Sequence, residues 1–393
     1  MITSGKALEL VLSHAAAIGK TVEVDLMDAL GHVLAADVIS RMDMPPFRQS
    51  AMDGYAIKSW DSDTYTLIGE IEAGSDFNPE LNRGEAVRIF TGAAVPDSAT
   101  AVMMQEKVTV KGKRLRLEMP ARPELNIRAK GEQVKKGAIA LARRTVIKGA
   151  HVGFLAGLGI TKVKVIKKPS IAIVVTGNEL VPPGTFLPYG KIYESNGAML
   201  KASLSALGYK NTRVVGVVDN YEETKNVLRE TISNADIVII TGGVSVGDYD
   251  FVGKALIAIG VEQVFYKVNQ KPGKPLFFGR KDSTSVFGLP GNPGAALTCF
   301  YIYVYPLLKA YEGAEEVHLH RISMPVLSAY RSTEGRAEFL KAELKDSGVH
   351  ILGGQSSAKV KAFGEANALV FLPEKSTLIR KGDHVQTILL PNL

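Results

Sequence analysis

The chain has 393 residues, 46% of them hydrophobic and 22% charged, an ordinary balance for a globular protein of roughly two to four domains. Its net charge of +7 suits anionic partners. The densest basic stretch, residues 107–116, has no aromatic residue to stack on bases, so we expect no nucleic acid partner. The single cysteine, Cys299, excludes an internal disulfide and predicts a buried thiol in a reducing, cytoplasmic compartment.

The first 168 residues are expected to form two domains. Residues 4–18 predict an amphipathic helix, capped by Ser4, rather than a signal peptide. We expect this helix to pack near a second one at 151–158, so that residues 1–45 and 146–168 make one elongated helical and linker domain. Short alternating runs with glycine turns predict a β-rich domain at 46–145. No segment approaches the roughly 20 apolar residues of a membrane span, so no membrane partner is expected.

Strands and helices alternate from residue 169 to residue 317, which predicts an α/β domain with a parallel sheet. The ligand crevice of such a domain lies beyond the carboxyl ends of the strands. Residues 318–393 return to short strands and predict a small all-β, barrel-like domain. In the α/β domain the expected strands are residues 171–175, 213–218, 236–240 and 286–287, and the expected helices are residues 196–207, 222–232, 251–259 and 293–311.

Glycine-rich loops follow three of these strands and lie at the expected ligand edge. They are Thr176-Gly-Asn-Glu-Leu180, Thr241-Gly-Gly-Val-Ser-Val-Gly-Asp-Tyr-Asp250 and Leu289-Pro-Gly-Asn-Pro293. Glycine lets backbone N–H groups approach a phosphate, and the helix after Pro293 should aim free N–H groups at an anion. The stiff turn Lys271-Pro-Gly-Lys-Pro275 adds two positive charges. The sequence therefore predicts a site for an anionic small molecule.

Carboxylates at the same edge, Glu179, Asp219, Asp248 and Asp250, are suitable ligands for Mg²⁺. Simpler explanations stay open for single residues. Asp219 is suited to cap the helix that follows it, and Asp248 and Asp250 to form a turn. Asn292 is suited to the N-cap position with Pro293 as the first helical residue. Asp53-Gly54 is a suitable hairpin turn. No P-loop, dinucleotide fingerprint or Ser/His/Asp arrangement is present.

Taken together, the motifs resemble the MoeA-type molybdopterin molybdenumtransferase family, which is also seen as the E domain of gephyrin. The remaining matching segments are Pro45-Pro-Phe47, Ser50-Ala-Met-Asp-Gly-Tyr-Ala56, Arg88-Ile-Phe-Thr-Gly-Ala93 and Asn126-Ile-Arg128 with Gly131-Glu132. They run in the family's order along nearly the whole chain. Two positions depart from the family pattern, because Asn178 and Gln133 stand where the family often has aspartate.

The resemblance implies that adenylylated molybdopterin and molybdate react, with Mg²⁺, to give molybdenum cofactor and AMP. It implies a homodimer of four-domain subunits, with the site between the MogA-like α/β domain of one subunit and the β-rich domain of the other. The implied catalytic residues are Asp53, Thr91, Glu179, Asp219 and Asp250, and the last three would also hold the metal ion. The implied substrate-binding residues are Arg128, Gly242, Gly243, Ser245, Lys271, Lys274, Pro290, Asn292 and Pro293.

Three alternatives remain at this point. The α/β domain alone is similar to the MogA-type molybdopterin adenylyltransferase, which shares two of the glycine loops and is also a candidate partner as the upstream enzyme. A second alternative is a protein that is not an enzyme, a scaffold that binds the pterin without turnover. Tungstate can replace molybdate, since the two oxyanions have nearly the same size and charge.

Overall fold

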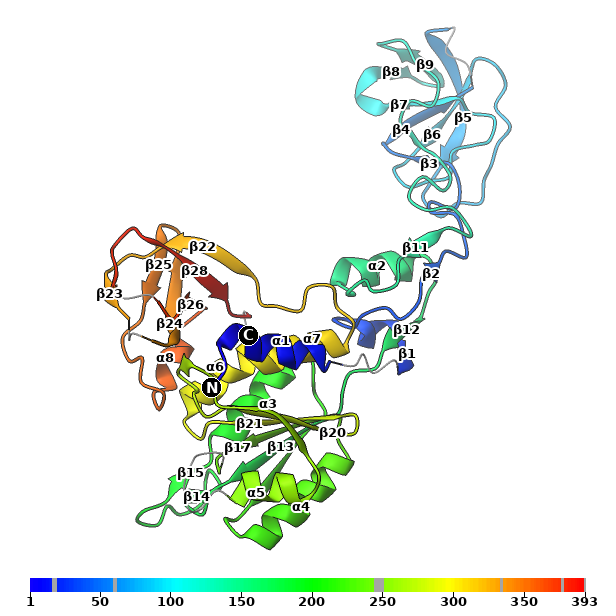
Figure 1. Cartoon of the computed structure of the whole chain (residues 1–393). Helices are drawn as coiled ribbons and strands as arrows, with labels where there is room; N and C mark the ends of the chain where they lie inside the picture. Colours follow the sequence, from blue (N-terminus) through cyan, green and yellow to red (C-terminus); the bar gives the residue numbers. More distant parts are fainter. Residues whose placement is uncertain (16–19, 59–61, 244–250, 333–334, 376–377, 392–393) are drawn as a thin grey trace. The chain divides into compact units, whose positions relative to one another are not determined.

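The computed structural model describes the chain except residues 16–19, 59–61, 244–250, 333–334, 376–377 and 392–393. The chain divides into two compact units (Figure 1). Unit 1 comprises residues 1–22, 31–33 and 166–393, and unit 2 comprises residues 23–30 and 34–165. The four finer domains expected from the sequence stay a prediction. Within the described residues, none of the helices has the length and apolar character needed to cross a bilayer.

A six-stranded sheet forms the centre of the α/β part of unit 1. Four parallel strands lie at the predicted positions, but β20 and β18 extend the sheet in antiparallel pairing, so the sheet is mixed rather than parallel. Only two residues join β20 to β21, and so short a connection can make a hairpin but no crossover. The strand order is β16 (Thr212–Val217), β13 (Ile171–Thr176), β17 (Ile237–Thr241), β21 (Thr284–Leu289), β20 (Phe277–Lys281) and β18 (Glu262–Tyr266).

Helices cover both faces of this sheet, as expected for strands buried on both sides. Alternate residues of β13 show the division, since Ile173 packs into one apolar cluster and Val174 into the other. The cluster around Val174 includes α4 (Tyr221–Ser233) and α5 (Phe251–Ala258), and the cluster around Ile173 includes α3 (Asn196–Ala206) and the helices after Pro293. The short strands β14 (Leu180–Val181) and β15 (Ile192–Tyr193) pair beside the sheet edge.

The helix predicted over 293–311 is interrupted by a π-helical turn. It consists of α6 (Pro293–Cys299), the π-helix η3 (Phe300–Val304) and α7 (Tyr305–Tyr311). The N–H of Tyr305 bonds to the carbonyl of Phe300, five residues back. Pro306 has no N–H to continue an α-helical ladder across this point, which explains the local change of pitch.

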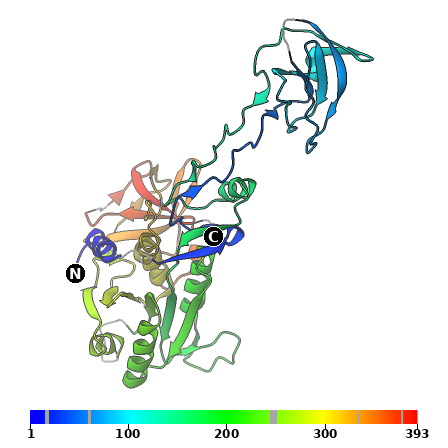
Figure 2. The same ribbon diagram turned by 90° about the vertical axis from the view of Figure 1, so that its right-hand side faces the viewer.

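The N-terminal helix α1 (Ser4–Ser13) packs against η3 and α7, as Figures 1 and 2 show. Ala7 and Val11 are fully buried in the same cluster as Ile173. The expectation that this helix packs against residues 146–168 is therefore corrected. Its cap is Thr3 rather than Ser4, because the Thr3 hydroxyl accepts a hydrogen bond from the Lys6 N–H at 3.2 Å.

The C-terminal part of unit 1 is mostly β-structure, as predicted, with one short helix, α8 (Lys361–Gly364). Strand β19 (Gln270–Lys271) pairs in parallel with β24, so this sheet includes the segment that leads into the Lys-Pro-Gly-Lys-Pro turn. The strand order is β19-β24-β26-β28-β22, β25 pairs with β24, and one parallel bridge between Val326 and Val349 links the end of β22 to β25, as expected for a barrel-like arrangement. The strands are β22 (Arg321–Pro325), β23 (Tyr330–Arg331), β24 (Ala337–Lys345), β25 (Gly348–Ile351), β26 (Ala368–Leu372), β27 (Leu378–Ile379) and β28 (His384–Leu389).

Unit 2 contains its own six-stranded sheet and a separate cluster around the helix at residues 149–157. Gly54 is required in the sheet, because a Cβ there would lie 2.0 Å from the Met103 carbonyl oxygen. In order the sheet strands are β7 (Ala101–Met104), β4 (Gly54–Ile57), β6 (Glu85–Ile89), β5 (Thr64–Ile71), β9 (Arg114–Leu117) and β8 (Val108–Lys111). The other elements of this region are β1 (Thr21–Asp25), η1 (Leu26–Ala29), β2 (Val38–Ile39), β3 (Gln49–Ser50), η2 (Gln105–Lys107), β10 (Ile127–Arg128), β11 (Ile139–Leu141), α2 (Gly149–Gly157) and β12 (Lys162–Ile166).

Candidate functional site

A pocket of about 540 Å³ in unit 1 collects positive charge; we call it the lysine pocket. The Lys-Pro-Gly-Lys-Pro turn, the start of α6 and the loop 353–359 form its walls. Lys271, Lys274 and Arg336 contribute three cations, and the described residues that line the pocket include no carboxylate. Such a lining favours an anionic ligand. The remaining lining residues are Gln270, Pro272, Gly273, Pro275, Pro290, Asn292, Ala295, Gln355, Ser356 and Ser357.

The ammonium group of Lys271 is held by a buried carboxylate behind the pocket wall. Lys271 Nζ lies 3.0 Å from Glu338 Oε1, and the Glu338 side chain is fully buried. The Ser332 hydroxyl donates to the other carboxylate oxygen at 2.9 Å. Burial, with the negative charge of Glu338 nearby, raises the pKa of Tyr330 to about 12. The ion pair therefore fixes one cation at the pocket edge.

A buried polar network supports the Lys-Pro-Gly-Lys-Pro turn from below. The Gln270 side-chain amide donates to the Pro272 carbonyl at 3.0 Å, and the Tyr303 hydroxyl donates to the Gln270 side-chain carbonyl. Gly273 has φ +90°, and a Cβ there would lie 2.4 Å from Cys299 Sγ. The turn therefore requires glycine on steric and conformational grounds. Cys299 is fully buried, which confirms the predicted core thiol, and burial raises its pKa to about 12.

The start of α6 differs from the expected anion site. Asn292 occupies the N-cap position and Pro293 is the first helical residue, but the Asn292 side chain makes no cap and donates to Ser357 Oγ at 3.0 Å. The Gly294 N–H donates to the Ser357 carbonyl at 2.8 Å, and Ala295 donates to the carbonyl of Asn292. The expectation of free N–H groups here is corrected, because the first donors of the helix already have partners. Side-chain cations remain the anion-binding groups.

A second pocket, of about 510 Å³, adjoins the first; we call it the glycine-loop pocket. Pro275, Pro290 and Asn292 line both pockets. A Cβ on Gly242, which has φ +85°, would lie 2.4 Å from the Thr176 carbonyl oxygen, so glycine allows these two loops to meet. The other lining residues are Thr176, Glu179, Leu180, Ile192, Tyr193, Glu194, Ser195, Asn196, Thr241, Gly242, Gly291, Pro293 and Ala358.

The two pockets bring together several residues singled out in the sequence. Glu179 and Pro293 line the glycine-loop pocket, and Lys271 lines its neighbour. The carboxylate of Glu179 folds over Gly177, where a Cβ would lie 2.7 Å from Oε2. Gly243 follows Gly242 directly and has φ +62°. Asp248, Asp250 and Ser245 lie outside the described residues.

Asp219 lines neither pocket and is paired with Asn178 instead. The Asn178 N–H donates to Asp219 Oδ2, and the Asp219 N–H donates to Asn178 Oδ1, both at 3.0 Å. The cap of α4 is Asn220, whose side chain accepts from the Glu223 N–H, so the capping explanation for Asp219 is wrong. No group of three potential metal ligands occurs within the described residues, which exclude Asp250.

Unit 2 brings Asp53 and Thr91 together on its surface. Both the N–H and the hydroxyl of Thr91 donate to Asp53 Oδ1 at 2.7 Å. The hydroxyl bond and then the backbone bond hold the pKa of Asp53 below its ordinary value, and the charge of Arg88 adds to this. The hairpin-turn explanation for Asp53 is wrong, because β4 pairs with β6 and β7 while β3 pairs with β10.

Arg128 is linked to the turn after Thr91 through the side chain of Gln49. Its guanidinium donates to the Gln49 side-chain carbonyl at 3.4 Å, and the Gln49 amide donates to the Gly92 carbonyl at 3.1 Å. Strand pairing places Arg128 opposite Gln49. The sequence motifs at 49–53, 91–92 and 127–128 therefore converge on one part of unit 2.

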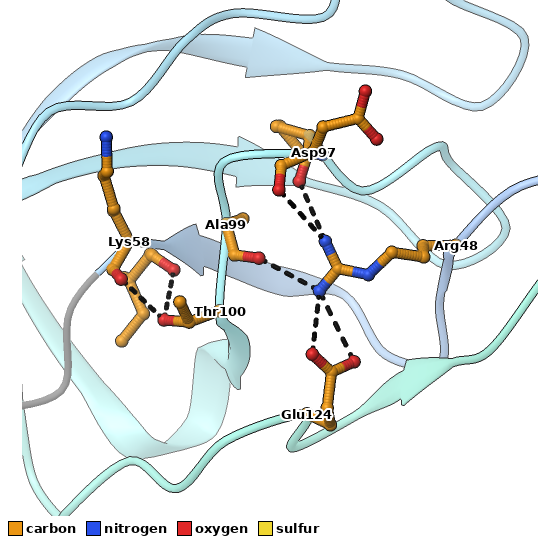
Figure 3. Close-up of polar contacts among 8 residues, drawn as sticks. Arg48, Lys58, Asp97, Ala99, Thr100 and Glu124 are labelled. Atoms are coloured by element: carbon orange, nitrogen blue, oxygen red, sulfur yellow. Dashed lines mark hydrogen bonds and ion pairs between the residues drawn. The ribbon is translucent and has the colours of Figure 1, made fainter.

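Arg48 fixes the chain segments that carry these motifs (Figure 3). Its guanidinium donates to the carbonyls of Pro96, Asp97 and Ala99 and to the Glu124 carboxylate, at 2.9 to 3.4 Å. One planar cation thus joins the start of the Ser-Ala-Met-Asp-Gly-Tyr motif to the segments that follow Thr91 and precede Arg128.

Sequence reasoning missed Arg336 and Ser357 as pocket-lining residues. Arg336 and Ser357 lie in loops of the C-terminal part of unit 1, which carried no motif in the sequence. A usable signal was the presence of Glu338 and Lys341 among the apolar residues of the segment 337–342. Both are nearly fully buried, and buried charges need specific partners.

Comparison with known proteins covers almost the whole chain. Residues 2–159 match the MoeA N-terminal region (domain I and II). Residues 172–310 match a probable molybdopterin binding domain, and residues 324–390 match the MoeA C-terminal region (domain IV).

Individual relatives agree over the same length. A molybdopterin molybdenumtransferase of Staphylococcus epidermidis is 33% identical, over 94% of this chain and 91% of that protein. One of Staphylococcus aureus is 35% identical with the same coverage. A crystal structure of a molybdopterin biosynthesis moeA protein from Pyrococcus horikoshii has a TM-score of 0.84 and 30% identity, and covers 99% of this chain and all of that one. The chain therefore belongs to the molybdopterin molybdenumtransferase family.

Proposed function

We propose that this protein transfers molybdate to adenylylated molybdopterin, releasing AMP and forming molybdenum cofactor. Membership of the family makes it a transferase of molybdenum cofactor biosynthesis. The observation that carries the assignment of the site is the adjoining pair of pockets in unit 1, one lined by three cations and the other by glycine loops and Glu179.

Electrostatics explains the need for the lysine pocket. Molybdate and the pyrophosphate of the pterin are both anions, and two unit charges 4 Å apart repel by about 4 kcal/mol at an effective dielectric constant of about 20. Lys271, Lys274 and Arg336 offset this repulsion when molybdate occupies the lysine pocket. The buried Glu338 keeps Lys271 in place without lining the pocket itself.

The glycine-loop pocket suits the larger substrate. Thr176, Gly242 and Gly291 bring backbone close to a ligand there, and the pocket shares one wall with the lysine pocket. A pyrophosphate bound near Pro290 and Asn292 therefore lies beside the oxyanion. Gly243 and Ser245 follow Gly242 in the same glycine-rich segment and complete our assignment of the substrate-binding residues.

Mg²⁺ fits the acidic residues of this edge as an ion that the protein and the substrate phosphates bind together, rather than one enclosed by protein ligands alone. Mg²⁺ commonly uses one or two carboxylates plus substrate phosphates, and it would neutralise charge on the pyrophosphate. Glu179 lines the pocket and is the first candidate ligand. Asp219 already accepts a hydrogen bond from Asn178, and Asp250 is the third candidate from the sequence.

We assign Asp53, Thr91 and Arg128 to the same reaction in a homodimer, with each site completed by the β-rich part of the partner subunit. Their exposure and convergence on unit 2 support a contact with a ligand or a second surface. The upstream adenylyltransferase is the expected source of the substrate, and the cytoplasm is the expected location.

One assay tests the reaction. The protein is incubated with adenylylated molybdopterin, Mg²⁺ and molybdate, and AMP is measured. Wild-type protein should release AMP only with an oxyanion present, and tungstate in place of molybdate tests the preference between the two. Binding of the pterin without AMP release would favour a scaffold, and AMP transfer from ATP to free molybdopterin would favour an adenylyltransferase.

The dimer assignment needs a separate experiment. Asp53→Ala and Lys274→Ala proteins should each be nearly inactive, but mixing them under conditions that exchange subunits should restore activity, since a mixed dimer contains one intact site. Equal inactivity before and after mixing, with subunit exchange verified, would place both residues in the site of one subunit.

A further inference from the structure

Lys341 on β24 is a buried cation with unusual partners. Its side chain is 4% exposed, although lysine rarely lies in a protein interior. Nζ donates to three backbone carbonyls, those of Gly354 at 2.9 Å, Ser356 at 3.1 Å and Lys359 at 3.0 Å. An ammonium group has three donors, so its hydrogen-bonding capacity is used completely by one loop.

The backbone of Lys341 also forms hydrogen bonds with the loop at residues 354–359. The Lys341 N–H donates to Gln355 Oε1 at 3.0 Å, and the Gln355 amide donates back to the Lys341 carbonyl at 2.8 Å. Residues 354–359 have no regular secondary structure of their own. The conformation of this segment therefore depends largely on Lys341.

This loop forms one wall of the lysine pocket. Gln355, Ser356 and Ser357 line the pocket, and Ser357 contacts Asn292 and the N–H of Gly294 at the start of α6. A Cβ on Gly294 would lie 2.8 Å from the Ser357 carbonyl oxygen, so the loop sits directly against the helix. A displaced loop would change the shape of the pocket that Lys271 and Lys274 also line.

The charge of Lys341 is not neutralised by a neighbour. No carboxylate oxygen of the described residues lies within 4.0 Å of Lys341 Nζ. The buried carboxylate of Glu338, on the same strand, pairs with Lys271 instead. Burial lowers the pKa of Lys341, and the charge of Lys359 adds to the effect. Carbonyl oxygens satisfy the hydrogen bonds but leave a net positive charge, which an anion in the adjacent pocket complements.

We propose that Lys341 is a positioning residue for oxyanion binding, which shapes the lysine pocket by holding residues 354–359 against the start of α6. This inference rests on the proposed function, since it assumes that the pocket binds molybdate. Lys341 itself does not line the pocket. Its removal should therefore weaken oxyanion binding much more than binding of the pterin substrate.

The test compares Lys341→Met and Lys341→Gln with wild-type protein, and uses Lys345→Met as the matched control. Lys345 lies on the same strand, is half-exposed, and pairs only with Glu343 in the described structure. The dissociation constant for molybdate alone is measured by equilibrium dialysis, and KM is measured separately for molybdate and for adenylylated molybdopterin. Circular dichroism and thermal unfolding check the fold.

We expect molybdate affinity to fall by at least about tenfold in both variants, because three charge-assisted hydrogen bonds to the loop are lost or weakened. KM for the pterin should change by less than about threefold, since that substrate depends mainly on the neighbouring pocket. Lys345→Met should behave like wild-type protein. Lys341→Gln keeps donors for the carbonyls and serves as the decisive variant if Lys341→Met does not fold.

Three results would overturn the proposal. Folded Lys341 variants with unchanged molybdate affinity would separate the residue from oxyanion binding. An equal rise of both KM values would make its role general rather than specific to the oxyanion, and failure of both variants to fold would make Lys341 a residue of stability alone. Absence of molybdate binding by wild-type protein is a different outcome, because it would overturn the proposed function of the pocket itself.

Discussion

The lysine pocket of unit 1 and the Asp53–Thr91 pair of unit 2 are built on different principles. Both regions are formed by turns that contain proline or glycine. The walls of the pocket are held by hydrogen bonds and an ion pair from three buried side chains, Gln270, Glu338 and Lys341, each at most 4% exposed. Asp53 and Thr91 are exposed, and their geometry depends on two hydrogen bonds to each other. The first region is therefore preorganised by buried polar side chains, whereas the second presents an exposed carboxylate, which our proposal places against the partner subunit.

Removing a pocket cation should have the largest effect and would test the binding side of the comparison. Lys274→Ala should lower kcat/KM for molybdate by about 10² to 10³-fold, because a preorganised cation near a developing or bound oxyanion contributes strongly in a sheltered pocket. Lys254→Ala on the exposed face of α5 is the control. Equal activity of both variants would remove the lysine pocket from the reaction.

Asp53→Ala should follow, with a loss of about 10²-fold that appears in kcat rather than in KM for molybdate, as expected for a group acting in the transition state. Steady-state kinetics at saturating molybdate measures this. Asp63→Ala, which removes another exposed carboxylate of unit 2, should leave kcat unchanged. A rise in KM alone would make Asp53 a binding residue and would blur the distinction between the two regions.

Thr91→Val should have a smaller effect, about tenfold in kcat, together with a shift in pH dependence. Loss of the hydroxyl raises the pKa of Asp53 toward its ordinary value of 3.8, so the acid limb of activity should move to higher pH. Because folding lowers the pKa of Asp53, its ionised carboxylate stabilises the folded protein at pH values above the ordinary pKa. That stabilisation is lost as the pH falls through the lowered pKa of the folded state. A pH–rate profile identical to that of wild-type protein would contradict this role.

Gly273→Ala should act on stability and on the pocket together. A Cβ would meet Cys299 Sγ in a left-handed conformation, a strain of about 1–3 kcal/mol in the free energy of unfolding. Urea denaturation measures the loss, and adding Cys299→Ala should recover part of it by removing the sulfur atom. No recovery in the double variant would mean that the left-handed backbone alone causes the strain.

Asn178→Asp should have the smallest effect, less than about threefold in kcat/KM. Asn178 contacts Asp219 through its backbone N–H and through Oδ1, and an aspartate can accept the same hydrogen bond from the Asp219 N–H. The departure from the family pattern at this position therefore keeps the local geometry. Asn178→Ala removes the acceptor and should reduce activity more than Asn178→Asp does; the opposite order would contradict this explanation.

Strands buried on both faces were predictable, because runs such as residues 171–175 and 237–240 are apolar throughout and end in glycine loops. The antiparallel pair β18–β20 was not predictable. Apolar and polar residues alternate only weakly in these two strands, and the strands lie between motifs that suggested loops. The π-helical turn before Pro306 was also missed, although a proline within an apolar helix predicts some interruption.

The candidate site was predictable where short motifs fix the backbone, as at Gly242 and Gly273. It was not predictable where residues distant in sequence supply the wall. Ser357 meets Asn292 across 65 positions, and the pairing of β19 with β24 is one of the long-range contacts that join these parts of the chain. Long-range strand pairing leaves no local signal in the sequence, so the role of the C-terminal strands became clear only from the structure.

The burial of Cys299 also has a consequence for sulfur chemistry. Molybdopterin carries a dithiolene, and a two-electron oxidant can join one of its thiolates to an accessible cysteine thiolate as a mixed disulfide. The single cysteine of this chain stays protonated beneath Gly273, with a pKa of about 12 and no exposed surface. Cys299 therefore offers no accessible thiolate that an oxidant could couple to the sulfur of such a ligand.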